Sequence, residues 1–178
     1  MFKKLLIASV ILTTTSSVVN AAGAPAPYLG ASVGLLSITS ESHPAYRAID
    51  GNISVGYGGI VSPNVNLAGE FAYTPSSGII SGRDLLKTTW DLGFSLLPGY
   101  YFSERTMAYV RIGAAYTRFN FNKGISRTGG QLGFGLQTNV CQNWDLRGEY
   151  VWTKYQSVKQ IASPNSDKFN IGLVYKFE

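Results

Sequence analysis

Apolar and polar side chains alternate along most of the chain after its first 22 residues. The stretch WDLRGEYVW, which begins at Trp144, shows the pattern well. Trp144, Leu146 and Trp152 have one parity, whereas Arg147 and Glu149 have the other. Because successive side chains of a strand point to opposite faces, this stretch predicts a strand with one apolar, aromatic face and one charged face.

Seven further segments share this period of two, and no helical period competes with them. The eight predicted strands are 28–38, 49–61, 65–74, 87–102, 107–119, 130–139, 144–155 and 168–177. Short turns follow the second, fourth and sixth of them. Long polar loops are predicted after the others, at 39–48, 75–86, 120–129 and 156–167. Short connections at one end and long ones at the other are typical of an up-and-down transmembrane β-barrel. The fold class predicted is therefore all-β, an eight-stranded antiparallel barrel of this kind.

The two faces indicate which side of the barrel is polar. One parity is aliphatic and aromatic, whereas the other is rich in glycine, small residues and charge. An eight-stranded barrel leaves room inside only for side chains, so the small and charged parity suits the lumen. A buried charge is costly unless it is paired. We therefore expect an ion network in the lumen, made by Glu70, Asp91, Arg111, Arg147, Glu149 and Lys168.

The apolar parity is expected to face lipid, with aromatic side chains near the segment ends as an interfacial girdle. The residues predicted for this girdle are Trp90, Tyr100, Tyr116, Trp144, Trp152 and Phe177. A soluble barrel would bury this apolar face and expose the charged one. The sequence favours the opposite arrangement.

The first residues have the features of a secretory signal peptide. Lys3 and Lys4 precede a short apolar run, and a small-residue site ends at Ala21. The run is too short to span a bilayer, which needs roughly 20 residues. We therefore predict a signal peptide at 1–21 and a barrel domain at 22–178.

Charge and cysteine content narrow the range of functions. Without Lys3 and Lys4, 13 of the 15 basic residues remain against 10 acidic ones, and no basic run is interleaved with aromatics, so nucleic acid is not expected as a partner. Cys141 is the only cysteine, so no internal disulfide is possible. It is expected to be a small residue in a turn, although a free thiol or pairing with another chain stays open.

The signal peptide, the eight amphipathic segments and the stretches YVRIGAAYTRF, LRGEYVW and FNIGLVYKF resemble the small outer-membrane β-barrel family. That family includes the OmpA transmembrane domain, OmpX and the opacity proteins. The resemblance implies the outer membrane of a Gram-negative cell, with outer-membrane lipid, lipopolysaccharide and the barrel assembly machinery as partners. The family's last strand usually ends in an aromatic residue. Here Glu178 follows Phe177, which departs from that pattern.

The function expected is a non-enzymatic surface barrel that contributes to envelope integrity and presents four loops for adhesion or contact with a host or the environment. Lys123, Arg127 and Lys159 are candidate loop contacts for anions such as lipopolysaccharide phosphates or acidic glycans. A narrow channel for small solutes is the alternative.

A barrel enzyme that modifies lipid A is less favoured. The single histidine, His43, is followed by Pro44 and Ala45 and does not form the His-x-Ser-Asn motif of the deacylases. It is expected to be a polar loop residue. No metal site and no cofactor are expected, because one His and one Cys lie far apart in the chain.

Overall fold

The computed structural model describes residues 25–40, 43–81, 88–119, 125–156 and 164–177. In these ranges the chain forms nine antiparallel strands. No helix in the described part of the chain is long and apolar enough to cross a membrane. The strands are β1 (Ala26–Ser40), β2 (His43–Ser62), β3 (Val65–Thr74), β4 (Ser77–Ser81), β5 (Thr88–Tyr101), β6 (Thr106–Phe119), β7 (Ile125–Cys141), β8 (Trp144–Tyr155) and β9 (Asn165–Lys176).

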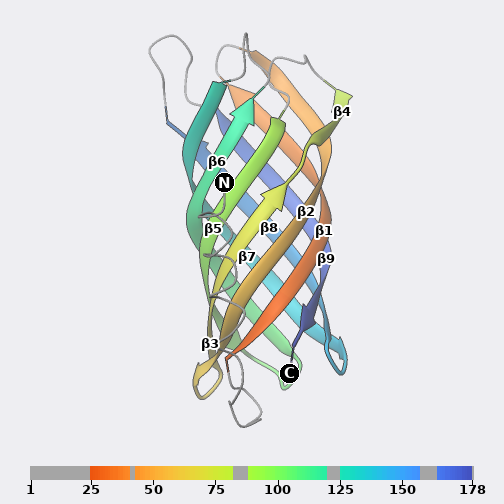
Figure 1. The fold of residues 1–178 in the computed structure, drawn as a ribbon, viewed down its shortest axis with the longest axis vertical. Coiled ribbons are helices and arrows are strands. Elements are labelled where there is room, and N and C mark those ends of the chain that lie inside the picture. The colour runs from red at the N-terminus through yellow and green to blue at the C-terminus, as the bar shows by residue number, and fades with distance from the viewer. Residues whose placement is uncertain (1–24, 41–42, 82–87, 120–124, 157–163, 178) are drawn as a thin grey trace, which may run out of the picture.

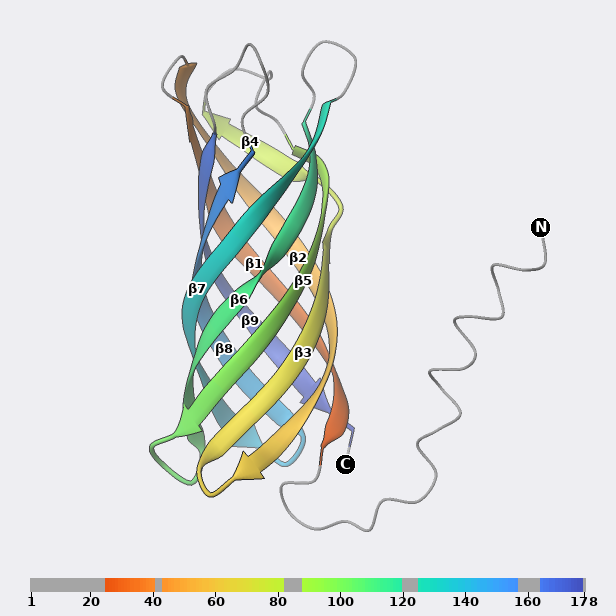
Figure 2. The same cartoon turned by 90° about the vertical axis from the view of Figure 1, so that its left-hand side faces the viewer.

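Eight of these strands close into a barrel. Neighbours in sequence pair with one another, and the circle closes because β1 pairs with both β2 and β9. Gly34 on β1, for example, is in register with Asp50 on β2 and with Asn170 on β9. The strands run obliquely around a common axis (Figures 1 and 2). The predicted eight-stranded antiparallel barrel is confirmed.

The two ends of the barrel differ in their connections. The short turns after β2, β5 and β7 lie at one end together with the C-terminus, and this is called the inner end (bottom of Figure 1). Asn64, in the first of these turns, has a φ of 64°, a left-handed conformation that asparagine tolerates. The opposite ends of the barrel strands lie with β4 at the other end, called the outer end (top of Figure 1).

The wall of the barrel is apolar outside and polar inside. On the outer surface, Val33 and Phe134 are each 66% exposed, and apolar side chains of every barrel strand share this surface. Inward-facing positions of the same strands bury Glu70, Arg111 and Arg147. A soluble protein does not expose so much contiguous apolar area. The inside-out arrangement predicted from the sequence is the one found.

At the outer end the strands extend further than predicted. Residues 39, 40 and 43–48 are in β1 and β2, residues 125–129 are in β7, and residues 165–167 are in β9, although all were expected to be loop. In these extensions the apolar side chains point inward and the charged ones point outward. Leu36, Ile38 and Tyr46 point inward and are buried, whereas Arg47 and Arg118 are exposed. The apolar residues leave the outer surface where that surface becomes polar, but the strands remain paired by backbone hydrogen bonds.

Two further residues or segments predicted to be loop are in strands. His43 is the first residue of β2 and not a loop residue. The segment 75–86 contains β4, which pairs with β2 and continues the line of β3 after a break at Pro75 and Ser76. Proline has no N–H for the ladder, and this explains why one long strand is divided into β3 and β4.

Candidate functional site in the lumen

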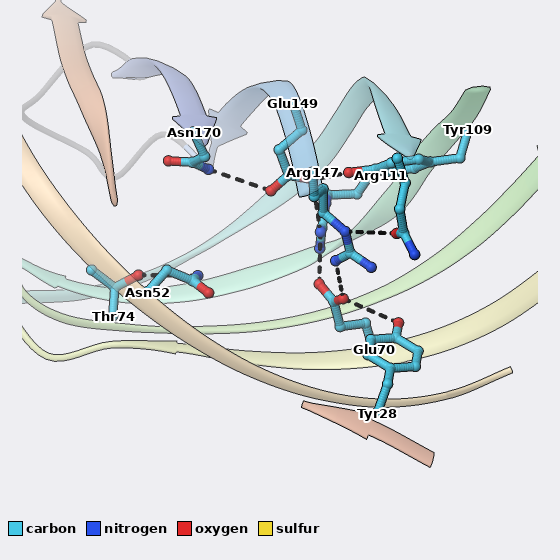
Figure 3. A network of polar contacts seen from close by, with 10 residues as sticks. Tyr28, Asn52, Glu70, Thr74, Tyr109, Arg111, Arg147, Glu149 and Asn170 are labelled. Atoms are coloured by element: carbon cyan, nitrogen blue, oxygen red, sulfur yellow. Dashed lines mark hydrogen bonds and ion pairs between the residues drawn. The ribbon is translucent and has the colours of Figure 1, made fainter. Parts of the chain in front are cut away.

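Four charged side chains meet in the inner half of the lumen and form what we call the inner cluster: Glu70, Arg111, Arg147 and Glu149 (Figure 3). Arg111 Nη2 lies 2.7 Å from Glu70 Oε1 and 2.9 Å from Glu149 Oε2. Arg147 Nη1 donates to Glu70 Oε2. All four side chains are buried, so two carboxylates and two guanidinium groups neutralise one another away from water.

Two tyrosines complete the inner cluster. Tyr28 donates to Glu70 Oε2 at 3.0 Å, and Tyr109 donates to Glu149 Oε2 at 2.7 Å. The guanidinium carbon of Arg147 lies 5.5 Å from the centroid of each tyrosine ring. Arg147 is therefore held between two aromatic rings as well as by its ion pair. Fixed in this way from several strands, its side chain has little freedom to move.

The network continues from Arg147 to the inner rim. Arg147 Nε donates to Gln137 Oε1 at 2.9 Å, and Gln137 Nε2 donates to Asp145 Oδ2 at 2.6 Å. Asp145, which is buried, also pairs with Lys176 at 2.7 Å. The side chain of Lys176 is 29% exposed, so this last ion pair reaches solvent. Hydrogen bonds and ion pairs thus run without a break from the inner rim to the middle of the barrel.

A second, outer cluster lies above it and consists of Asp50, Asp91 and Lys168. Lys168 Nζ is 3.1 Å from Asp50 Oδ2 and 3.1 Å from Asp91 Oδ2. Thr117 donates to Asp91 Oδ1 at 2.6 Å. All three charged groups are buried, so Lys168 is shared by two carboxylates.

Apolar side chains close the lumen on both sides of the charges. At the outer end Tyr46, Phe119 and Tyr155 pack with Leu36, Ile38 and Ala48. At the inner end Leu97, Met107 and Val174 pack with Tyr28, Ala68 and Tyr109. Beside the inner cluster, a cavity of about 20 Å³ is lined by Asn52, Ser54 and Glu149 among others. It is large enough for about one water molecule. In the described part of the chain the lumen is filled.

All six residues predicted for the lumen network point inward, and the structure divides them between the two clusters. Sequence reasoning missed Asp50, Tyr28 and Tyr109. Each has the inward parity of its strand: Asp50 is two residues from Asn52, Tyr28 two from Gly30 and Tyr109 two from Arg111. Parity could therefore have found them, but they stood at the edges of the predicted segments or counted as apolar.

The loop contact assigned to Arg127 was wrong. Arg127 lies in β7, is 6% exposed, and donates from Nη1 to the carbonyl oxygen of Gln156 at 2.9 Å. It lies within the strand because β7 begins at Ile125, five residues before the predicted start. Lys123 and Lys159 lie outside the described residues, as do the predicted signal peptide and Glu178. Cys141 is exposed and is the last residue of β7, at the turn into β8.

The aromatic residues predicted for the interfacial girdle lie in two belts on the outer surface, one toward each end. Trp90, Tyr116 and Trp152 belong to the outer belt, and the rings of Trp90 and Tyr116 are 5.5 Å apart. Tyr100, Trp144 and Phe177 belong to the inner belt. Amphipathic rings prefer the membrane–water interface, so two belts mark the two edges of an apolar band.

The described residues contain no group of three or more His, Cys, Asp and Glu side chains that could hold a metal ion. The charged side chains of the inner and outer clusters form ion pairs with one another instead.

Comparison with known proteins gives the barrel its family. A family model described as an outer membrane protein beta-barrel domain matches residues 6–177. The chain belongs to this outer-membrane barrel family. Its apolar wall is therefore the surface that faces lipid in the outer membrane.

Solved structures of other outer-membrane barrels have the same fold. Neisserial surface protein A (NspA) has a TM-score of 0.64 at 17% identity, and the match covers 85% of this chain and 97% of that one. Ail, the attachment invasion locus protein of Yersinia pestis, has a TM-score of 0.57 at 16% identity, with 85% and 99% covered. A major outer membrane protein of Thermus thermophilus has a TM-score of 0.53 at 12% identity, with 85% and 100% covered. No curated protein sequence matches the chain.

The packing around two glycines predicts different effects on stability when each is replaced by alanine. A Cβ at Gly135 would lie 2.5 Å from Cζ and Oη of Tyr109, whose hydroxyl is held by Glu149. Gly135→Ala is expected to lower the free energy of unfolding by about 1–3 kcal/mol, because the ring cannot move away without breaking that bond. Gly148→Ala, where a Cβ would meet nothing within 4 Å, is the control and should not destabilise. Urea titrations of the refolded barrels measure both. An equal effect of the two substitutions would contradict the packing argument.

Proposed function

We propose that this barrel is a non-enzymatic outer-membrane surface protein that presents its outer-end loops for adhesion or contact with the environment and contributes to envelope integrity. The observation that carries the proposal is the filled lumen. Its charges are paired with one another and its two ends are closed by apolar clusters. A filled interior supports no substrate path, so we take the outer-end loops as the surface available for binding.

Anionic surfaces are the contact we propose for these loops. Lys123 and Lys159 lie in segments that the sequence predicts to be loops. Exposed Arg118 and Lys154 add positive charge at the outer ends of β6 and β8. A cationic rim would attract lipopolysaccharide phosphates or acidic glycans. One solved structure of Ail, with a TM-score of 0.54, is a complex with the heparin analogue sucrose octasulfate. This supports acidic glycans as the first class of ligand to test.

Orientation is tested first, by surface proteolysis. Trypsin added to intact cells is expected to cut only at loop sites such as Arg83, Lys123 and Lys159, and to spare Arg127, which is buried in β7. The fragments should still run as a folded barrel on gels without boiling and separate after boiling. Cleavage at the inner turn, next to Arg105, would show that the barrel is inserted the other way round.

Binding is tested with cells that express the wild type or the double variant Lys123→Gln and Lys159→Gln, at matched surface levels. Retention on immobilised heparin should exceed that of cells lacking the barrel, and should fall toward that background in the double variant and in high salt. Glu104→Gln, in the exposed turn between β5 and β6 at the inner end, serves as a charge-changing control that should leave retention unchanged. Equal retention by all strains would refute the adhesion proposal. Measuring conductance across planar bilayers tests the channel alternative separately.

A further inference from the structure

A groove of about 720 Å³ opens on the outer wall over β6, β7 and β8, at the level of the outer aromatic belt. The exposed residues that line it are Gly130, Leu132, Trp152, Lys154 and Gln156. All of them have the outward parity of β7 and β8, which they share with the lipid-facing Phe134. The groove therefore opens toward the membrane and not toward the lumen.

A missing side chain creates this groove. Gly130 on β7 is in register with Ala114 on β6 and with Lys154 on β8, and a Cβ at Gly130 would meet nothing within 4 Å. In the next outward-facing row toward the inner end, Leu132 is in register with Trp152. Space left open beside apolar side chains loses dispersion contacts. An acyl chain lying over Gly130 and against these two side chains would restore them.

The outer end of the groove is cationic. Lys154 is exposed and forms no ion pair with any described residue. Arg127, buried on the inward side of β7, donates to the carbonyl oxygen of Gln156 and likewise has no carboxylate partner in the described chain. Asp167 on β9 does not line the groove, and the hydroxyl of Tyr150 donates to it. Positive charge without a partner in the described chain favours an anionic ligand at this end.

We propose that the groove binds one molecule of a phosphorylated outer-leaflet lipid, the lipid A part of lipopolysaccharide, with an acyl chain over Gly130 and a phosphate on Lys154. The order of groups along the groove matches such a lipid. Leu132 and Trp152 lie toward the middle of the apolar band, and Lys154 and the exposed Gln156 lie toward its outer edge. Basic pockets at the membrane edge bind anionic lipid head groups. The inference rests on the orientation proposed above, which places the outer end in the lipopolysaccharide leaflet.

Binding of purified diphosphoryl lipid A to the whole barrel, refolded in uncharged detergent micelles, tests this site. Native mass spectrometry counts the molecules bound, and the wild type is expected to retain one. Lys154→Gln should lower the affinity by about tenfold, because a charge-assisted bond to the phosphate is lost. Gly130→Leu should also lower the affinity, because the new side chain occupies the groove, although its Cβ touches no other part of the barrel.

Each variant has a matched control that should bind lipid A as the wild type does. Arg47→Gln removes an exposed cation at the outer end of β2. Gly148→Leu fills a glycine position that is equally open but lies nearer the inner end of β8. Every variant is first checked for folding by its mobility shift on boiling. Dephosphorylated lipid A should bind the wild type about as weakly as lipid A binds Lys154→Gln.

Three results would overturn the proposal. They are equal affinities of Lys154→Gln and Arg47→Gln, equal affinities of Gly130→Leu and Gly148→Leu, or binding of phosphatidylglycerol as tight as that of lipid A. Failure of the adhesion proposal is recognised separately. Heparin retention is attributed to the predicted loop cations, whereas lipid A binding in micelles depends on Lys154 and needs neither those cations nor a membrane orientation.

Discussion

Glu70→Gln is expected to lower the free energy of unfolding by about 3–5 kcal/mol, the largest single effect that the structure predicts. Glu70 accepts hydrogen bonds from Tyr28, Arg111 and Arg147, and its side chain is 1% exposed. The neutral amide leaves two guanidinium groups facing Glu149 as their one remaining acid in the cluster. It also places an NH₂ group where those donors point. Breaking a buried ion pair costs more than the pair contributes, since the remaining charge stays buried.

Urea titration of the barrel refolded in lipid vesicles measures this effect. Glu104→Gln, in the exposed turn between β5 and β6, changes the same group at the surface and should alter stability by less than about 0.5 kcal/mol. The double variant of Glu70→Gln with Arg147→Gln should recover part of the loss, because it removes one of the unpaired guanidinium groups. If Glu70→Gln were as mild as Glu104→Gln, the inner cluster would not contribute to stability as the geometry indicates.

Phe134→Arg is expected to lower the free energy of unfolding by about 2–4 kcal/mol. The reason is different, because this side chain lies in lipid. Phe134 is 66% exposed on the outer wall, in the middle of the apolar run Leu132, Phe134 and Leu136 of β7. A charge near the bilayer midplane loses its hydration, whereas one near the interface does not. Val140→Arg, on the same strand and 55% exposed but next to the inner turn, should cost only about 0–1 kcal/mol.

Phe134→Ala separates charge from lost contact area. The ring of Phe134 lies 5.6 Å from that of Tyr150, so both substitutions remove this contact and only Arg adds a charge. Unfolding in vesicles should show a larger loss for Arg than for Ala at position 134. Equal losses for Phe134→Arg and Val140→Arg would mean that the two positions lie at the same depth, which would contradict the two aromatic belts.

The sequence by itself determined the class of fold and the orientation of its wall. A period of two repeated in eight segments, with short turns after every second one, indicates an up-and-down barrel because each strand must place one face in lipid and one in the lumen. The same parity identified Glu70, Asp91, Arg111, Arg147, Glu149 and Lys168 as inward-facing. These inferences hold because strand geometry alone fixes which side chains share a face.

Tertiary structure decided where the strands end and which charges meet. Beyond the apolar band, Leu36 and Tyr46 turn inward and Arg47 outward, so the sequence pattern reverses while the ladder continues. Partners in the lumen come from strands far apart in the chain, such as Arg147 with Glu70 and Lys168 with Asp91. Parity says that a charge points inward, but only the registers of all eight strands set its height. The height of each charge in the lumen determines its partners. Lys168 therefore pairs with two carboxylates, and Glu70 pairs with two arginines.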